Sequence, residues 1–282
     1  MKFQTDRRQF LALGGLASAA ASLPACARKR EVSREWAGMQ AVLDKWVAEK
    51  RVPGAGASIA RGLDQAVFMT AGTQSFGDPQ AMTPDTLFRA YSMTKPLTGM
   101  AAMLLIEDGK LGMDQNIADF IPGFANPRVL TNPDTSLDSR PARSGITVRQ
   151  LLTHTAGLGY SIVTKGPLLD AYNRLGLNPA QVSRRAMPGM PSYPTAPSLA
   201  EFADRLATLP LVAEPGQRWS YSVSLDLLGR VIELASGMSF DSFLQQRILT
   251  PLGMTSSWFQ VPQSAASRMT TNHFDLDGKP IP

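Results

Sequence analysis

The spacing of hydrophobic positions changes several times in the first third of the chain, and each change predicts a different element. Over residues 34–50 apolar side chains recur every three or four positions, which predicts a helix with one apolar face. Short apolar runs at 55–60 and 66–71 flank a polar loop and predict an antiparallel hairpin. Residues 94–108 are rich in Ala, Leu and Met, which predicts a buried helix. This part of the chain is therefore predicted to combine helices with an antiparallel hairpin.

The second half of the chain is predicted to be mostly helical. Residues 114–140 hold many Pro, Asn and Asp residues and predict ordered loops. Residues 176–198 contain several prolines and little periodicity, which predicts a long lid or surface loop. Further helices are expected at 148–154, 199–206, 225–235 and 239–249. We find no internal repeat or dividing linker, so residues 27–282 are expected to form one domain.

Residues 1–26 predict an export signal rather than part of the fold. Arg7-Arg8 precede an apolar run at 10–25 that is too short to span a bilayer as a helix. Thr5–Leu11 is similar to a twin-arginine export signal, and Leu23–Cys26 is similar to a lipobox, in which Cys26 would be acylated. A plain signal peptide whose cysteine has no role is the alternative. We expect a protein that is periplasmic or lipid-anchored on the outer side of the cytoplasmic membrane.

Composition and charge exclude several classes of protein. The 282 residues are 44% hydrophobic and 18% charged, which excludes a disordered chain. One cysteine excludes an internal disulfide and a thiolate zinc cluster, and two histidines leave little for another metal site. The net charge of +5 is scattered or lies in the first 34 residues, so we expect no nucleic-acid binding.

The candidate chemistry is the Ser92-Met93-Thr94-Lys95 sequence. Neither a G-x-S-x-G nor an H-E-x-x-H motif occurs in the chain. On a helix, residues three apart share a face, so the Lys95 amine can reach the Ser92 hydroxyl. Packing beside an apolar helix removes water from the lysine, which disfavours its charged form and makes it a usable base. The spacing alone is common, and a helix-start serine with an unrelated lysine is the alternative.

Four ordered blocks give this motif its context. They are Thr86–Lys95, Ile106–Pro122, Ile146–Leu158 (ITVRQLLTHTAGL) and Pro215–Gly237. Together they resemble the class C-like branch of the serine β-lactamase and penicillin-binding-protein-like superfamily, which includes family VIII carboxylesterases and D-amino-acid-releasing peptidases. The resemblance implies an α+β, β-lactamase/transpeptidase-like fold, with an antiparallel sheet flanked by helices and a helical subdomain.

The same resemblance implies roles for individual residues. Ser92 matches the acylated nucleophile, Lys95 the general base, and Tyr221 the tyrosine that relays a proton to the leaving group. A cation near a tyrosine lowers its pKa, which suits this relay; a core tyrosine with a satisfied hydroxyl is the alternative. Val223 stands where the lactamases carry an Asn that contacts the substrate amide. This departure favours ester hydrolysis.

Other reactive side chains are given structural interpretations. His154 lies inside the ITVRQLLTHTAGL block and is expected to be a buried, hydrogen-bonding residue rather than a base. His273 lies in a polar tail and receives no role. Met93, Met100 and Met103 are expected to fill the core.

The C-terminal part departs from the family pattern. No K-T-G, H-x-G or W-G-G triplet follows Tyr221, so the last sheet strands and one oxyanion donor are expected to be missing, and the 27–282 domain incomplete. The predicted function is hydrolysis of a small-molecule ester or amide through an acyl-enzyme, without metal or organic cofactor. A β-lactamase or D-Ala-D-Ala carboxypeptidase is one alternative, and a catalytically incomplete envelope binding protein is another.

Overall fold

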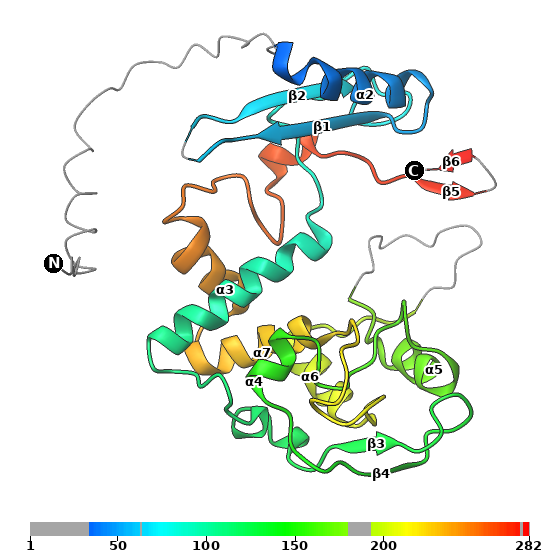
Figure 1. The fold of residues 1–282 in the computed structure, drawn as a ribbon, viewed down its shortest axis with the longest axis vertical. Coiled ribbons are helices and arrows are strands. Elements are labelled where there is room, and N and C mark those ends of the chain that lie inside the picture. Colours follow the sequence, from blue (N-terminus) through cyan, green and yellow to red (C-terminus); the bar gives the residue numbers. More distant parts are fainter. Residues whose placement is uncertain (1–33, 63, 180–192, 277–278, 282) are drawn as a thin grey trace, which may run out of the picture. The chain divides into compact units, whose positions relative to one another are not determined.

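A computed structural model describes residues 34–62, 64–179, 193–276 and 279–281 (Figure 1). The chain divides into two compact units, one up to Thr86 and again from Thr270, the other Leu87–Met269. The predicted export signal, including Cys26, lies outside the described residues. So does most of the predicted loop at 176–198.

The first unit is built on a hairpin and one helix. Strands β1 (Gly54–Ile59) and β2 (Val67–Gly72) pair antiparallel, with Gly54 opposite Gly72, which confirms the predicted hairpin. Helix α2 (Ala37–Ala48) follows a 3₁₀ turn, η1 (Arg34–Trp36), and lies along the hairpin (Figure 1). The Gln40 side chain donates a hydrogen bond to the Thr70 carbonyl at 3.1 Å, which fastens the helix to β2.

Two features of this unit differ from the sequence prediction. The apolar face expected over 34–50 is not buried: Met39, Val42 and Trp46 are 42%, 49% and 44% exposed, and α2 has no fully buried residue. A second antiparallel pair, β5 (Phe274–Leu276) with β6 (Lys279–Ile281), was not predicted, because strands of three residues are too short to show alternation.

The second unit holds most of the helices. Helices at 148–154, 199–206 and 225–235 are confirmed as α4, α6 and α7, whereas the one at 239–249 is α-helical only in its first half. The loops predicted at 114–140 contain two 3₁₀ turns and a strand pair, and α5 was not predicted. The elements are η2 (Tyr91–Met93), α3 (Thr94–Glu107), η3 (Ile117–Asp119), η4 (Pro122–Phe124), β3 (Arg128–Leu130), β4 (Ser139–Pro141), α4 (Val148–Leu152), α5 (Gly166–Leu175), α6 (Leu199–Ala207), α7 (Ser224–Ser236), α8 (Phe240–Leu244), the π-helical η5 (Gln245–Leu249) and η6 (Gln263–Arg268).

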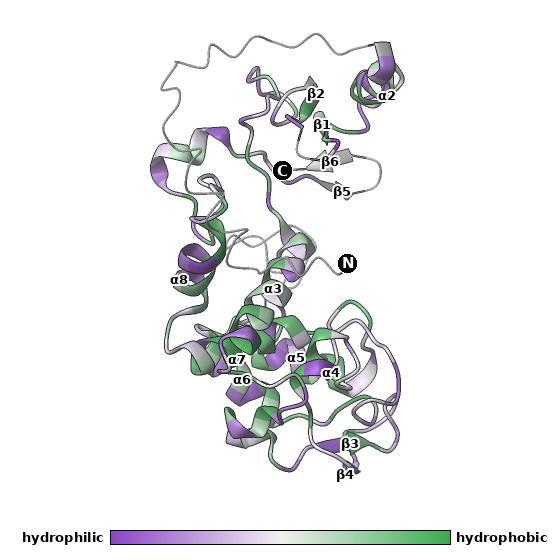
Figure 2. Cartoon of the chain, turned by 60° about the vertical axis from the view of Figure 1, so that its left-hand side comes forward, coloured by the Kyte–Doolittle hydropathy of each residue, from purple (hydrophilic) through white to green (hydrophobic). Residues whose placement is uncertain are grey.

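Helix α7 is the packing centre of the second unit. It contacts α3, α4, α6 and α8, and its apolar residues can be followed in Figure 2. Leu227, Leu228, Val231 and Ile232 are fully buried. Burial of each of these aliphatic side chains contributes about 1.5–3 kcal/mol to stability. This buried face of α7 therefore fixes where α3 and α7 meet. The residues at the start of both helices are thereby held in place.

Helix α3 is buried on one side only. Thr98, Ala101, Ala102 and Leu105 form its buried face. The prediction that the methionines fill the core is wrong, because Met100 and Met103 lie off the buried face of α3 and Met93 precedes the helix. Met93, Met100 and Met103 are 68%, 46% and 47% exposed.

The ITVRQLLTHTAGL block forms α4 and the turn that follows it. Thr147 and Gln150 make a capping box, in which each side chain accepts a hydrogen bond from the other residue's backbone N–H. His154 then has a left-handed backbone, with φ of 54°, and Gly157 one with φ of 80°. A Cβ at Gly157 would lie 2.1 Å from the Ala213 carbonyl oxygen, so only glycine fits this approach.

Candidate active site

The packing of α3 on α7 brings two hydroxyl groups together. Ser92 lies in the η2 turn that leads into α3, and Tyr221 lies two residues before Val223, the N-cap of α7. Although 129 positions separate them, Ser92 Oγ and Tyr221 Oη are 2.6 Å apart. Both groups stand at helix N-termini, where the backbone dipoles favour developing negative charge.

Lys95 completes the group from the first turn of α3. Its Nζ donates a hydrogen bond to Ser92 Oγ at 3.2 Å, which is the contact that the three-residue spacing predicted. The same Nζ lies 4.7 Å from the centroid of the Tyr221 ring. Lys95 is half-buried, whereas the sequence predicted a lysine shielded from water. Ser92 is exposed and therefore open to a substrate.

The electrostatic environment of Tyr221 suits proton transfer. Burial by itself would raise the pKa of its phenol, but the hydrogen bonds with Lys95 and Ser92, with the Lys95 charge, lower that pKa overall. The charge of Asp226 opposes the lowering. A phenol that releases its proton more easily is a better relay between two oxygen atoms.

The residue before Ser92 has an unusual backbone. Tyr91 has φ of 45°, in the left-handed region that bulky residues rarely occupy, and its ring is 51% exposed. Such a conformation costs of order 1–3 kcal/mol and persists only where the surroundings hold it. It turns the chain sharply immediately before Ser92.

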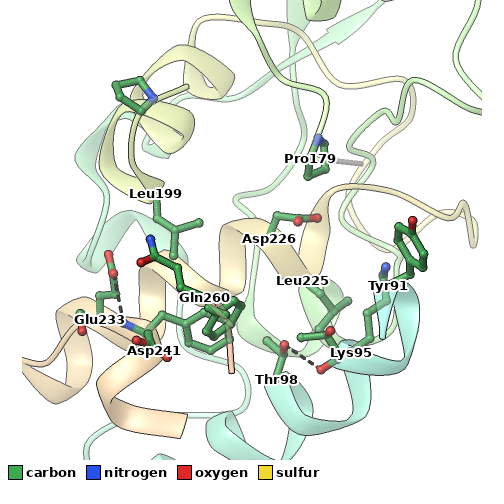
Figure 3. A pocket seen from close by; sticks show the side chains of 15 residues that line it. Tyr91, Lys95, Thr98, Pro179, Leu199, Leu225, Asp226, Glu233, Asp241 and Gln260 are labelled. Carbon is green, nitrogen blue, oxygen red and sulfur yellow. Dashed lines mark hydrogen bonds between the residues drawn. The ribbon is translucent and has the colours of Figure 1, made fainter. Parts of the chain in front are cut away.

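A pocket of about 640 Å³ opens beside Lys95 (Figure 3). Leu199, Leu225 and Phe240 give it apolar walls. Carboxyl groups also line it, and Asp226 projects between α7 and Lys95 in Figure 3. The pocket can therefore receive an apolar group of a substrate bound at Ser92.

Asp226 is the site residue that sequence reasoning missed. Burial raises the pKa of its carboxyl group to about 6, against the opposing effect of the positive charge of Lys95. Its position five residues after Tyr221, in the first turn of α7, was the available signal. An acidic residue in the first turn of a helix usually serves only to stabilise the helix dipole, so the position of Asp226 in the sequence was a weak indication of a site residue.

Replacing Asp226 by asparagine is expected to stabilise the protein above pH 6. The folded-state pKa lies above the ordinary value of 3.8, so the native state binds the proton more tightly and loses stability as pH rises from 3.8 to about 6. Ionisation of Asp226 therefore lowers the stability of the native state by about 2–3 kcal/mol. Asparagine does not ionise, so the variant avoids this loss. Urea unfolding at pH 8 measures the gain, which shrinks toward pH 4.

The control for this variant is Asp204→Asn, an exposed aspartate on α6. It should change the unfolding free energy by less than about 0.5 kcal/mol at either pH, as surface substitutions generally do. An Asp226→Asn variant no more stable than wild type at pH 8 would show that the carboxyl is not desolvated.

The remaining sequence candidates have mainly structural surroundings. Val223 is 0% exposed, so its side chain belongs to the core and offers no contact to a substrate. His154 is 9% exposed and its Nδ1 lies 3.1 Å from Ser222 Oγ, as expected of a buried, hydrogen-bonded residue. His273, in the first unit, accepts a hydrogen bond from the Phe76 N–H at 3.4 Å.

The described residues contain neither a metal-binding cluster nor a membrane-spanning helix. In the part of the chain that the structure describes, no group of three or more His, Cys, Asp or Glu side chains could hold a metal ion. Over the same residues, none of the helices combines the length and the apolar character that a bilayer crossing requires.

The family is decided by comparison with known proteins. The sequence profile of the Beta-lactamase family matches residues 39–280, which is most of the chain. The chain belongs to the Beta-lactamase family. Ser92, Lys95 and Tyr221 all lie within the matched residues, and so does the whole ITVRQLLTHTAGL block.

Individual relatives of this Beta-lactamase-family chain include esterases. Esterase EstB of Burkholderia gladioli is 33% identical over 243 residues, covering 85% of this chain and 55% of EstB. Protein Rv1367c of Mycobacterium tuberculosis is 37% identical over 191 residues, covering 67% of this chain and 43% of that protein. The chain thus spans about half the length of these curated relatives.

The solved structures confirm the fold class. EstCE1, described as a hydrolase with promiscuous acyltransferase activity, matches with a TM-score of 0.69 and 25% identity, over 87% of this chain and 58% of EstCE1. The α+β, β-lactamase/transpeptidase-like fold expected from the motifs is therefore correct. The strands of the described residues form three separate antiparallel pairs, β1–β2, β3–β4 and β5–β6.

Proposed function

We propose that the protein is a serine hydrolase of carboxylesterase type that works through an acyl-enzyme. The observation that carries the proposal is one serine oxygen in contact with two proton-transfer groups, 2.6 Å from Tyr221 Oη and 3.2 Å from Lys95 Nζ. A hydroxyl held this way can lose its proton as it attacks a carbonyl carbon. The exposed position of Ser92 leaves room for the ester.

The reaction would proceed in two halves. Lys95 acts as the base in its unprotonated form, and its amine accepts the Ser92 proton while Oγ forms a bond to the ester carbonyl carbon. The tetrahedral intermediate then releases the alcohol, whose oxygen receives a proton through Tyr221, and an ester of Ser92 remains. Water attacks that ester and gives a proton to the same two groups; the bond between the carbonyl carbon and Ser92 Oγ then breaks, Oγ takes that proton back, and the free acid leaves.

Two features support an ester rather than a β-lactam as the substrate. Val223 is buried at the position where the lactamases carry a substrate-binding Asn, so the polar anchor for a β-lactam side chain is missing. EstB is named an esterase and EstCE1 a hydrolase. The apolar walls of the pocket beside Lys95 suit an ester with an apolar group.

A comparison of two chromogenic substrates tests this choice. We expect kcat/KM for p-nitrophenyl butyrate to exceed that for nitrocefin by at least about 10-fold, because a missing hydrogen bond to a buried polar group costs about 1–3 kcal/mol. Measured with the full chain at pH 8, a clear preference for nitrocefin would contradict the esterase proposal. It would favour the β-lactamase alternative.

The alternative of a binding protein without catalysis is tested by a fluorophosphonate probe. The probe reacts with an activated serine, so the catalytic proposal predicts labelling of Ser92. A folded chain that stays unlabelled would favour the binding-protein alternative.

We propose in addition that the protein is exported. Support comes from Arg7-Arg8 and the apolar run at 10–25, with Cys26 as a candidate for acylation. Fractionation of cells producing the full chain should recover it outside the cytoplasm. Recovery in the cytoplasmic fraction alone would exclude export.

A further inference from the structure

His154 holds the backbone on both sides of Tyr221. Its carbonyl oxygen accepts a hydrogen bond from the Ser220 N–H at 2.9 Å. Its ring nitrogen Nδ1 accepts one from the Ser222 N–H at 3.2 Å. One residue therefore bonds to the neighbour before Tyr221 and to the neighbour after it.

The ring of His154 also supports the Tyr221 ring directly. The two centroids are 4.8 Å apart, and Tyr160 lies on Tyr221 at 5.4 Å. Packing of this kind restricts the rotamer of Tyr221 and with it the position of the phenol oxygen. The 2.6 Å contact to Ser92 Oγ depends on that position.

The backbone of His154 explains how one residue can make both bonds. With φ of 54°, the chain turns so that the carbonyl and the side chain face the same segment. Glycine adopts this conformation most readily, and asparagine, aspartate and histidine are enriched among the other residues that do. A residue with a side chain can therefore be kept here, beside a reactive centre, to make both bonds.

The hydrogen bonds define the protonation state of the ring. A backbone N–H can only donate, so Nδ1 must carry a lone pair, and the neutral ring carries its proton on Nε2. A protonated ring would place its Nδ1–H against the Ser222 N–H, and Nδ1 could then donate only to Ser222 Oγ, 3.1 Å away. Burial lowers the pKa of His154, and the positive charge of Lys95 on α3 lowers it further. Lys95 and Tyr221 are the titratable groups that face the ring.

We propose that His154 is a positioning residue that holds the Tyr221 phenol against Ser92 only while its Nδ1 is unprotonated. The proposal rests on the proposed acyl-enzyme function for its kinetic consequence. Protonation of the ring breaks the bond to the Ser222 N–H and lets Tyr221 move away. A displacement of about 1 Å in a catalytic group can lower the rate about 10²-fold.

Two substitutions of similar size separate positioning from packing. His154→Asn places an amide oxygen near the position of Nδ1, tolerates a left-handed backbone and does not titrate, whereas His154→Leu removes the acceptor. At pH 8 we expect His154→Asn to keep kcat for p-nitrophenyl butyrate within about 5-fold of wild type. His154→Leu should lose about 10²-fold in kcat with KM changed less than about 3-fold.

The pH profile provides a readout that a purely structural role would not change. Wild-type kcat should fall as the ring takes up its proton, below pH 6.5, so the ratio of His154→Asn to wild-type kcat should rise on acidification. ¹⁵N NMR of the imidazole should show the Nε2–H tautomer at pH 8 and a midpoint that matches the kinetic one.

Failure of the positioning role of His154 can be distinguished from failure of the proposed esterase function. Equal loss of kcat in the two variants at equal folded fraction, an Nδ1–H tautomer at pH 8, or a kcat ratio independent of pH through the NMR midpoint would overturn the proposal. A wild-type chain without esterase turnover would count against the proposed function, and the NMR tautomer would then decide the role of His154 by itself.

Discussion

Replacing Ser92 by alanine is expected to lower kcat for p-nitrophenyl butyrate by at least about 10⁴-fold. In the proposed mechanism Ser92 Oγ forms the acyl-enzyme bond, so the substitution leaves Lys95 and Tyr221 without a nucleophile to activate. Losses of this size follow removal of a covalent nucleophile in other hydrolases. Initial rates at saturating ester, with the protein concentration corrected for the folded fraction, measure the effect.

A matched control is available in the same unit. Ser144 is exposed and is not among the proposed catalytic residues, so Ser144→Ala should retain kcat within about 2-fold of wild type. If Ser92→Ala kept more than a tenth of the wild-type rate, the nucleophile would have to be another residue.

Replacing Lys95 by methionine should lower kcat by about 10²–10⁴-fold, which is the usual contribution of a positioned general base. Methionine keeps an unbranched apolar side chain and removes the amine that lies 3.2 Å from Ser92 Oγ. Loss of the Lys95 hydrogen bond and charge would also leave burial as the main influence on Tyr221, so the pKa of Tyr221 should rise. The kinetic ionisation of the phenol should therefore move to higher pH.

The joint action of Lys95 and Tyr221 gives this prediction a second readout. Lys95→Met combined with Tyr221→Phe should cost little more than the larger single effect, because residues that act as a unit are not additive. Lys165→Met, at an exposed lysine before α5, is the control and should leave kcat unchanged within about 2-fold. Fully additive losses would show that the two side chains act independently.

Local patterns predicted the elements that carry strong periodicity. The hairpin of β1 and β2 and helices α4, α6 and α7 were found where alternation or helical spacing indicated. The contact between Lys95 and Ser92 followed from their spacing, because two residues three apart at a helix start are neighbours whatever surrounds them. That part of the site is local in sequence.

The features that sequence reasoning missed depend on tertiary packing. Helix α5 begins with Gly166-Pro167, which reads as a turn, and is held by burial of Leu168 and Tyr172. The exposure of Met100 and Met103 depends on which face of α3 meets α7, and the amino-acid composition of a helix does not determine that face. The desolvation of Asp226 likewise arises only when α7 lies beside Lys95.

Covalent acylation of Ser92 is detected most directly by intact-protein mass spectrometry. The full chain, mixed with p-nitrophenyl butyrate and quenched in acid within milliseconds to seconds, should gain the mass of one butyryl group, and peptide mapping should place that group on Ser92. The Ser92→Ala variant should gain none. A wild-type chain that hydrolyses the ester without any adduct at Ser92 in this time range, or with the adduct on another residue, would contradict the account.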